Sequence, residues 1–158
     1  MDQTHIHLLL NHFPILGTFF GLCLLIYGFI KKKADLENAG FTTLLIVALL
    51  SIPAYLSGEE AEETVEHIPE VSEYYMELHE ELAETALWMM LVTGGLSLIA
   101  LIVFYFQNKR IATLRIATII FASVTFVVMA VVGSYGGKIR HSELRGDTTE
   151  QVHDDDDH

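Results

Sequence analysis

Four long blocks of apolar residues, separated by short polar stretches, dominate the sequence. The blocks are residues 6–30, 41–57, 85–106 and 111–135. A helix needs about 20 mostly apolar residues to cross the hydrocarbon core of a bilayer, and soluble proteins seldom carry four such blocks. The third block has no acidic or basic side chain from Ala86 to Phe106. We therefore predict an all-α, polytopic membrane protein with four spans.

The order of blocks and polar stretches predicts an up-down-up-down four-helix bundle. The longest polar stretch inside this pattern, residues 58–84, is predicted to form a short helical connection outside the membrane. Ser57, followed by Glu60 three positions later, has the pattern of a capping box. This pattern predicts a separate helix over Glu59–His67.

Serine and glycine residues predict where other helices begin, end and pack. Ser72 predicts the start of a helix that continues from Glu73 into the third block. Gly17 and Gly21, continued by Gly28, form a stripe that permits close contact between helices. The fourth block runs into glycines, which are common after helix ends. These are Gly133, Gly136 and Gly137.

Basic residues are concentrated at one set of block ends. Six of the nine lie there: Lys31, Lys32, Lys33, Lys109, Arg110 and Arg115. The other three are Lys138, Arg140 and Arg145. Because short loops rich in Lys and Arg stay in the cytoplasm, we predict that both chain termini lie outside. In a bacterium this places them on the periplasmic side of the inner membrane.

The acidic residues lie almost entirely on the opposite side. Of the 21, only Asp35 and Glu37 fall on the basic side, and the net charge is −12. An acidic exterior attracts cations and argues against nucleic acid as a partner. Residues 146–158 end in HDDDDH and have no apolar periodicity, so they are predicted to form a disordered acidic tail. Residues 1–145 then form a single membrane domain.

All eight histidines can be placed on the acidic side. They are His5, His7, His12, His67, His79, His141, His153 and His158. Histidine is costly near a bilayer and commonly ligates metals and haem iron, so this one-sided distribution predicts a site there. His12 lies in apolar sequence, and His79 begins a helical face of small residues that includes Ala83 and Ala86. A buried histidine needs a hydrogen bond or a metal partner, which makes these two the preferred ligands.

Short motifs resemble those of a known family. They are H7-L-L-L-N-H12-F-P-I, P53-A-Y-L-S-G, His79 at the start of the third span, and G136-G-K-I-R-H141. Together they are similar to motifs of the bacterial four-span proteins grouped as the domain of unknown function 2231 family. The resemblance covers Thr4 to about Arg145. Two departures are Leu8, where the family has proline, and His141, which lies nearer the glycines.

The resemblance implies a membrane redox component, and a b-type haem is the first functional hypothesis. Two neutral imidazoles from different helices bind haem iron axially. His12 and His79 are the predicted pair, with His7 and His141 as substitutes. Such a protein would exchange electrons with a quinol or a periplasmic electron carrier, alone, as a homo-oligomer or within a larger redox complex.

Two other hypotheses remain open at this stage. In the first, the histidines bind iron, zinc or copper together with carboxylates, as helical bundles do; the acidic ligands would be Glu59, Glu63 and Glu80. In the second, the protein has no cofactor and is an interaction subunit whose histidines respond to pH. The sequence shows no nucleophile constellation, phosphate loop or nucleotide motif, and it leaves open whether the protein is an enzyme.

Overall fold

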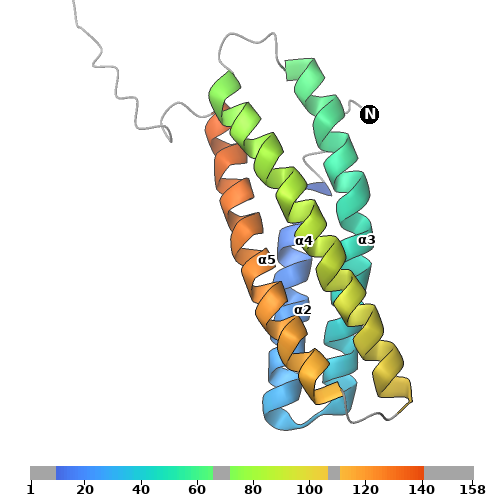
Figure 1. Ribbon diagram of the computed structural model, residues 1–158. Coiled ribbons are helices and arrows are strands. Elements are labelled where there is room, and N and C mark those ends of the chain that lie inside the picture. Colours follow the sequence, from blue (N-terminus) through green and yellow to red (C-terminus); the bar gives the residue numbers. More distant parts are fainter. Residues whose placement is uncertain (1–9, 66–71, 107–110, 141–158) are drawn as a thin grey trace, which may run out of the picture.

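The structure, a computed structural model, describes residues 10–65, 72–106 and 111–140, and these residues form four helices and no strand (Figure 1). The helices are α2 (His12–Lys31), α3 (Ala34–Val65), α4 (Glu73–Tyr105) and α5 (Ile111–Arg140). Each is long and apolar enough to cross a membrane. The predicted all-α membrane protein with four spanning helices is therefore confirmed.

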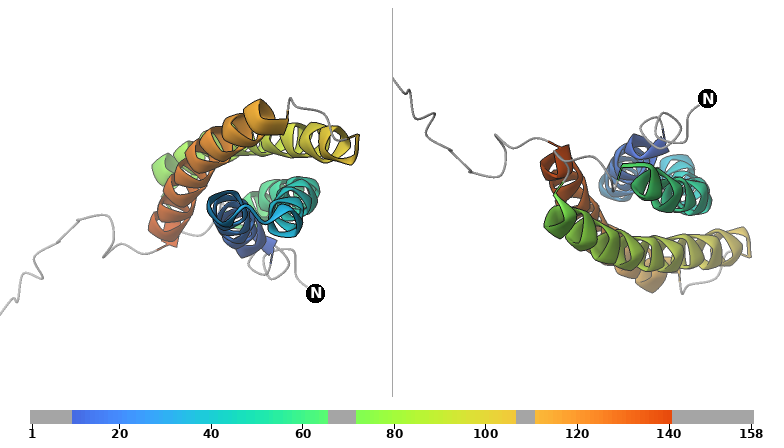
Figure 2. Two further views of the ribbon diagram at one scale, coloured as in Figure 1. Left: turned by 90° about the horizontal axis from the view of Figure 1, so that it is seen from below. Right: turned by 90° about the horizontal axis from the view of Figure 1, so that it is seen from above.

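The helices form two antiparallel hairpins that pack side by side. Helix α2 lies along α3 and α4 lies along α5, while α3 contacts α4 and α2 contacts α5. Figure 2 shows α4 and α5 as one curved layer beside the α2–α3 pair. Large apolar side chains point outward from the four helices, including Phe20, Ile46, Trp88 and Ile120. In a membrane these faces contact lipid.

Helix α2 is the shortest, so the two ends of the bundle differ. It has 20 residues, whereas α3, α4 and α5 have 32, 33 and 30. These three extend beyond the start of α2 (Figure 1). We call this end, where α4 begins, the His79 end, and the opposite end, where α5 begins, the Arg115 end.

Glycines allow α2 and α3 to approach closely, as the sequence stripe predicts. A Cβ atom on Gly21 would lie 2.9 Å from the Leu44 Cγ atom. A Cβ atom on Gly40 would lie 2.7 Å from the Leu25 backbone nitrogen and 2.9 Å from the Gly21 carbonyl oxygen. Since these neighbours include backbone atoms, no side chain fits at Gly40 without separating the two helices.

The core is apolar at the Arg115 end and carries methionine and small residues nearer the His79 end. The first cluster consists of Leu22, Leu25, Phe41, Leu44, Ala100 and Ala122. The second consists of Val47, Ala48, Ala86, Met90 and Met129. Buried hydroxyl groups lie along the same interior, and each donates a hydrogen bond to the carbonyl four residues earlier; they are Thr18, Ser51, Thr93, Ser97, Thr118 and Thr125. This pairing satisfies polar groups that could not bond to water inside a membrane.

Two predicted helix boundaries are wrong and one is confirmed. Helix α3 continues through Pro53 and Ser57, so no separate helix begins at Glu59. The Ser57 hydroxyl bonds to the Ala54 carbonyl at 2.9 Å inside the helix and does not cap a new one. Helix α5 continues past its three glycines to Arg140, because those residues also propagate a helix when a neighbouring helix packs on them. Helix α4 does begin at Glu73, directly after Ser72.

Candidate functional site

His79 lies in the second turn of α4, and its imidazole is directed at α5. The ring is half-buried, and its Nδ1 atom lies 3.0 Å from the Val132 carbonyl oxygen. A carbonyl oxygen only accepts hydrogen bonds, so Nδ1 carries the proton and donates it. When the ring is neutral, this leaves Nε2 as the unprotonated nitrogen. This is the tautomer in which histidine binds a metal or haem iron through Nε2.

Gly136 of α5 makes room for the imidazole. A Cβ atom at this position would lie 3.1 Å from the His79 Cε1 atom and 3.3 Å from Nδ1. Both distances are shorter than ordinary van der Waals contacts between such atoms. The ring therefore rests directly on the α5 backbone, and Gly136 is required for this approach and not to end the helix.

Further contacts tie α4 to α5 above the imidazole. The Ser72 backbone N–H donates to the Ile139 carbonyl at 3.1 Å. The Lys138 ammonium lies 5.6 Å from the ring centre of Tyr75 and 5.2 Å from that of Tyr135. A cation over an aromatic face is stabilised by the ring quadrupole. His79 is thus held in a hairpin whose two helices are also joined above it.

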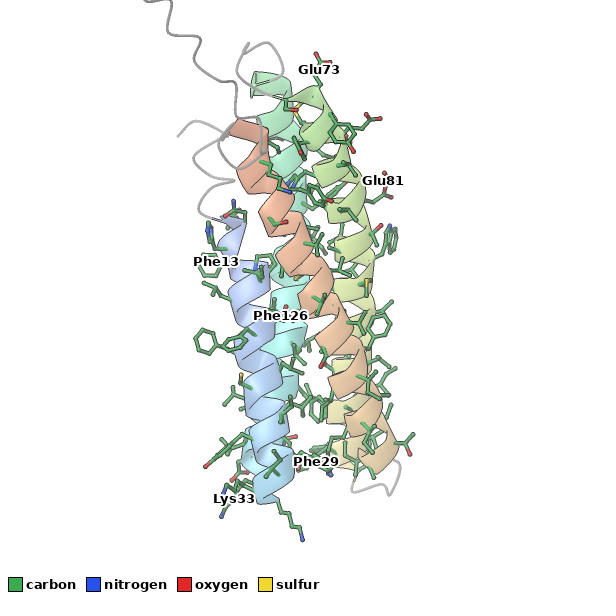
Figure 3. The ribbon with its side chains drawn as sticks, turned by 90° about the vertical axis from the view of Figure 1, so that its left-hand side faces the viewer. Phe13, Phe29, Lys33, Glu73, Glu81 and Phe126 are labelled. Carbon is green, nitrogen blue, oxygen red and sulfur yellow. The ribbon has the colours of Figure 1, made fainter. Side chains whose placement is uncertain are left out.

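His12 occupies a different environment. It lies in the first turn of α2 and is exposed, on a side of the helix that it shares with the exposed Phe13 and Leu16. Figure 3 shows Phe13 pointing away from the other helices. The described structure therefore does not bring the His12 and His79 rings together. His7 and His141, the predicted substitutes, lie outside the described residues.

The predicted carboxylate ligands gather at the α3–α4 contact. Glu59 of α3 forms a side-chain hydrogen bond with Tyr55, and Glu80 and Glu84 of α4 lie close enough to act electrostatically on the same phenol group. All three carboxylates are exposed. Glu63 belongs to α3, but its side chain lies outside the described part of the structure. The carboxylates thus gather beside α3, while His79 faces α5.

No three His, Cys, Asp or Glu side chains within residues 10–65, 72–106 and 111–140 meet in an arrangement that could hold a metal ion. The predicted mixed site of His79 with Glu59 and Glu80 is not assembled there. What these residues do form is a half-buried, oriented imidazole beside an exposed acidic surface.

The opposite end of the bundle holds an ion pair that the sequence reading missed. The Arg115 Nε atom of α5 lies 2.7 Å from the Glu37 Oε2 atom of α3, and the side chains are only 21% and 5% exposed. The Nε–H group does not point at that oxygen, so the contact is electrostatic and not an aligned hydrogen bond. The Arg115 guanidinium also lies 5.2 Å from the ring centre of Phe29 on α2. Arg115 therefore connects three helices and does not belong to the connecting loop, where the sequence had placed it.

Comparison with known proteins agrees with the resemblance seen in the motifs. Residues 3–144 match the family model described as "Predicted membrane protein (DUF2231)". The chain belongs to the DUF2231 family. No curated protein and no solved structure matches it.

In this DUF2231 chain the described motif residues occupy one half of the bundle. His12 begins α2, Pro53 lies in the second half of α3, His79 lies near the start of α4 and Gly136 lies near the end of α5. Each of these positions lies in the half of its helix nearer the His79 end, although they come from four different helices. Of these residues, His79 and Gly136 are in direct contact.

Proposed function

We propose that this protein is a membrane redox protein in which His79 ligates a b-type haem near the periplasmic face. The observation that carries the proposal is the hydrogen bond between His79 Nδ1 and the Val132 carbonyl. It fixes the ring orientation and leaves Nε2 as the basic nitrogen. A hydrogen bond of this kind on the distal ring nitrogen is a regular feature of histidines that bind metals.

The separation of histidine from carboxylates favours haem over a mixed non-haem site. A haem iron takes its four equatorial ligands from the macrocycle and needs only axial side chains from the protein. His79 supplies one such ligand, and no carboxylate is needed. The mixed metal site predicted from the sequence would require Glu80 or Glu59 beside the imidazole, whereas these gather around Tyr55. The candidates for the second axial ligand are then His7 and His141, because His12 is exposed and does not lie beside His79.

The charge distribution supports the location of the site. Six of the nine basic residues belong to the Arg115 end or its connecting segments, which favours a cytoplasmic position for that end. The His79 end, with both chain termini, would then face the periplasm of a bacterial inner membrane. A haem there would supply one-electron chemistry, and the protein would orient it and exclude water.

The exposed acidic surface of α4 supports a basic partner at the same end. Its exposed glutamates are Glu73, Glu77, Glu80, Glu81 and Glu84, and Figure 3 shows Glu73 and Glu81 projecting outward from this helix. Complementary charge accelerates the encounter of two proteins and sets their orientation. A basic periplasmic electron carrier would be guided towards the His79 end, and a quinol would reach it from the lipid.

An absorption spectrum of the purified protein tests the proposal. Full-length protein expressed in haem-replete cells should show a Soret band that is lost in His79→Ala. Glu81→Ala changes an exposed residue of the same helix and should retain the band. His7→Ala and His141→Ala identify the second ligand, and His12→Ala should retain the band. A folded but colourless protein would contradict the haem proposal, and elemental analysis of the same sample would then test for iron, zinc or copper.

A further inference from the structure

Two methionine sulfur atoms converge on one hydroxyl group in the bundle interior. The Thr18 Oγ1 atom of α2 lies 3.4 Å from the Met90 Sδ atom of α4 and 3.7 Å from the Met129 Sδ atom of α5. Thr18 and Met90 are fully buried, and Met129 is 7% exposed. Three helices thus bring one oxygen and two sulfur atoms to the same buried point.

Hydrogen bonding engages the two sulfur atoms only weakly. The Thr18 hydroxyl has one proton, and its nearest acceptor is the Pro14 carbonyl oxygen at 2.6 Å. An oxygen acceptor at this distance is much stronger than a thioether sulfur, which is a weak acceptor. The carbonyl therefore takes most of the hydrogen bond, and the contacts of the hydroxyl with the two thioethers are weak. The sulfur lone pairs stay available to a stronger partner.

We propose that Met90, Met129 and Thr18 form a binding site for Cu(I). Thioether sulfur is a soft ligand that selects Cu(I) over harder divalent ions. The three donors are uncharged, which suits a monovalent cation, because the desolvation cost of burying an ion rises steeply with its charge. Zn(II), Fe(II) and Mg(II) would require the carboxylates or imidazoles that this point lacks.

The site lies well inside the bundle from His79, on the same face of α4. His79 and Met90 are eleven residues apart, about 16 Å along the helix axis, at 1.5 Å per residue. Ala83 and Ala86 lie between them on the same face, and Ala86 is buried in the methionine-containing cluster. The distance also separates the site from the proposed haem, so the two proposals stand independently.

Copper binding by the purified full-length protein tests the site. The detergent-solubilised protein is incubated with Cu(I) under ascorbate and titrated with the Cu(I) chelator bicinchoninate. We expect about one tightly held Cu(I) per chain and sulfur ligands in its X-ray absorption spectrum. Met90→Leu and Met129→Leu should each weaken binding by about tenfold or more. Methionine-to-leucine changes conserve volume and should leave the fold intact.

Matched variants separate this site from the alternatives. Met89→Leu alters the neighbouring methionine, which does not contact Thr18, and should bind Cu(I) as the native protein does. His79→Ala should also retain equilibrium Cu(I) affinity, although it loses the proposed haem. Unchanged affinity in a folded Met90→Leu/Met129→Leu double variant would overturn the proposal, as would equal losses in Met89→Leu. Loss of the ion in His79→Ala alone would assign it to the imidazole and also overturn the methionine site.

Discussion

Replacing Gly136 with alanine tests the packing of His79 against α5. The added Cβ atom would lie 3.1 Å from Cε1 and 3.3 Å from Nδ1 of the imidazole. Unstrained contacts between such atoms are about 3.5–4.0 Å, so the ring must retreat by about 0.5 Å. The hydrogen bond from Nδ1 to the Val132 carbonyl, now 3.0 Å, would lengthen towards about 3.5 Å, where a hydrogen bond is largely lost.

Two opposing free energies set the expected effect on stability. Loss of the hydrogen bond costs about 1 kcal/mol. Alanine in place of glycine inside a helix stabilises by about 1 kcal/mol. The two changes nearly cancel, so Gly136→Ala should unfold at close to the native temperature while its imidazole is displaced.

Gly133→Ala, one turn earlier in α5, is the matched control. Its Cβ atom would lie 3.8 Å from the Ile15 Cδ1 atom, which is an ordinary contact. The variant should therefore be stabilised by the higher helix propensity of alanine and lose no hydrogen bond. The difference between the two variants, about 1 kcal/mol, corresponds to about 2–4 °C in a protein of this size.

Two measurements on the purified protein test whether the imidazole packs on Gly136. Thermal unfolding can be followed by the fluorescence of the single tryptophan, Trp88. The ¹⁵N resonances of the His79 ring, assigned by comparison with His79→Gln, report whether Nδ1 still carries the proton. If Gly136→Ala and Gly133→Ala are equally stabilised and the His79 ring signals are unchanged, the imidazole does not rest on Gly136 and the geometry of the site is wrong.

Three further changes test other contacts by the same unfolding measurement. Gly40→Ala should destabilise by about 2 kcal/mol through overpacking, because its Cβ atom would press on backbone atoms of α2; a native unfolding temperature would contradict this helix contact. Arg115→Met leaves the buried Glu37 carboxylate without its partner and should cost about 3 kcal/mol. Adding Glu37→Gln should restore part of this loss; no recovery in the double variant would refute the coupling. Thr93→Val removes a hydroxyl contact of 3.1 Å with Thr125 and should cost only about 0.6 kcal/mol, so a loss of several kcal/mol would show that the contact has another role.

The four spans and their order could be predicted from the sequence because the signal is local. Each block is long, apolar and bounded by polar residues, and a helix is the backbone structure that can satisfy its own polar groups in a bilayer. The same local reasoning placed the start of α4 at Glu73. It failed at Ser57 and at the glycines of α5, because a capping pattern or a glycine pair can occur at the end of a helix and also inside a helix that continues. Only the neighbouring helix decides between them.

The contacts that give the structure its chemistry are long-range and could not be predicted in this way. Glu37 and Arg115 are 78 positions apart in the sequence, and Thr18 meets sulfur atoms 72 and 111 positions away. Periodicity says that such residues face inward, but not which helix they meet. The diagonal contacts of the bundle, α3 with α5 and α2 with α4, depend on how the two hairpins are rotated against each other.

One feature of the site does follow from helix geometry once the neighbours of α4 are known. Successive residues are 100° apart around a helix, so Glu80 and Glu84 lie 100° and 140° from His79 and only 40° from each other. Helix α4 has α5 on one side and α3 on another. A histidine that faces α5 therefore cannot share its ligand with glutamates that face α3 on the same turn. The sequence places these residues close together, but the helix separates the imidazole from the carboxylates, and this separation is why a cofactor needing only axial nitrogen suits the site better than a carboxylate-bound metal.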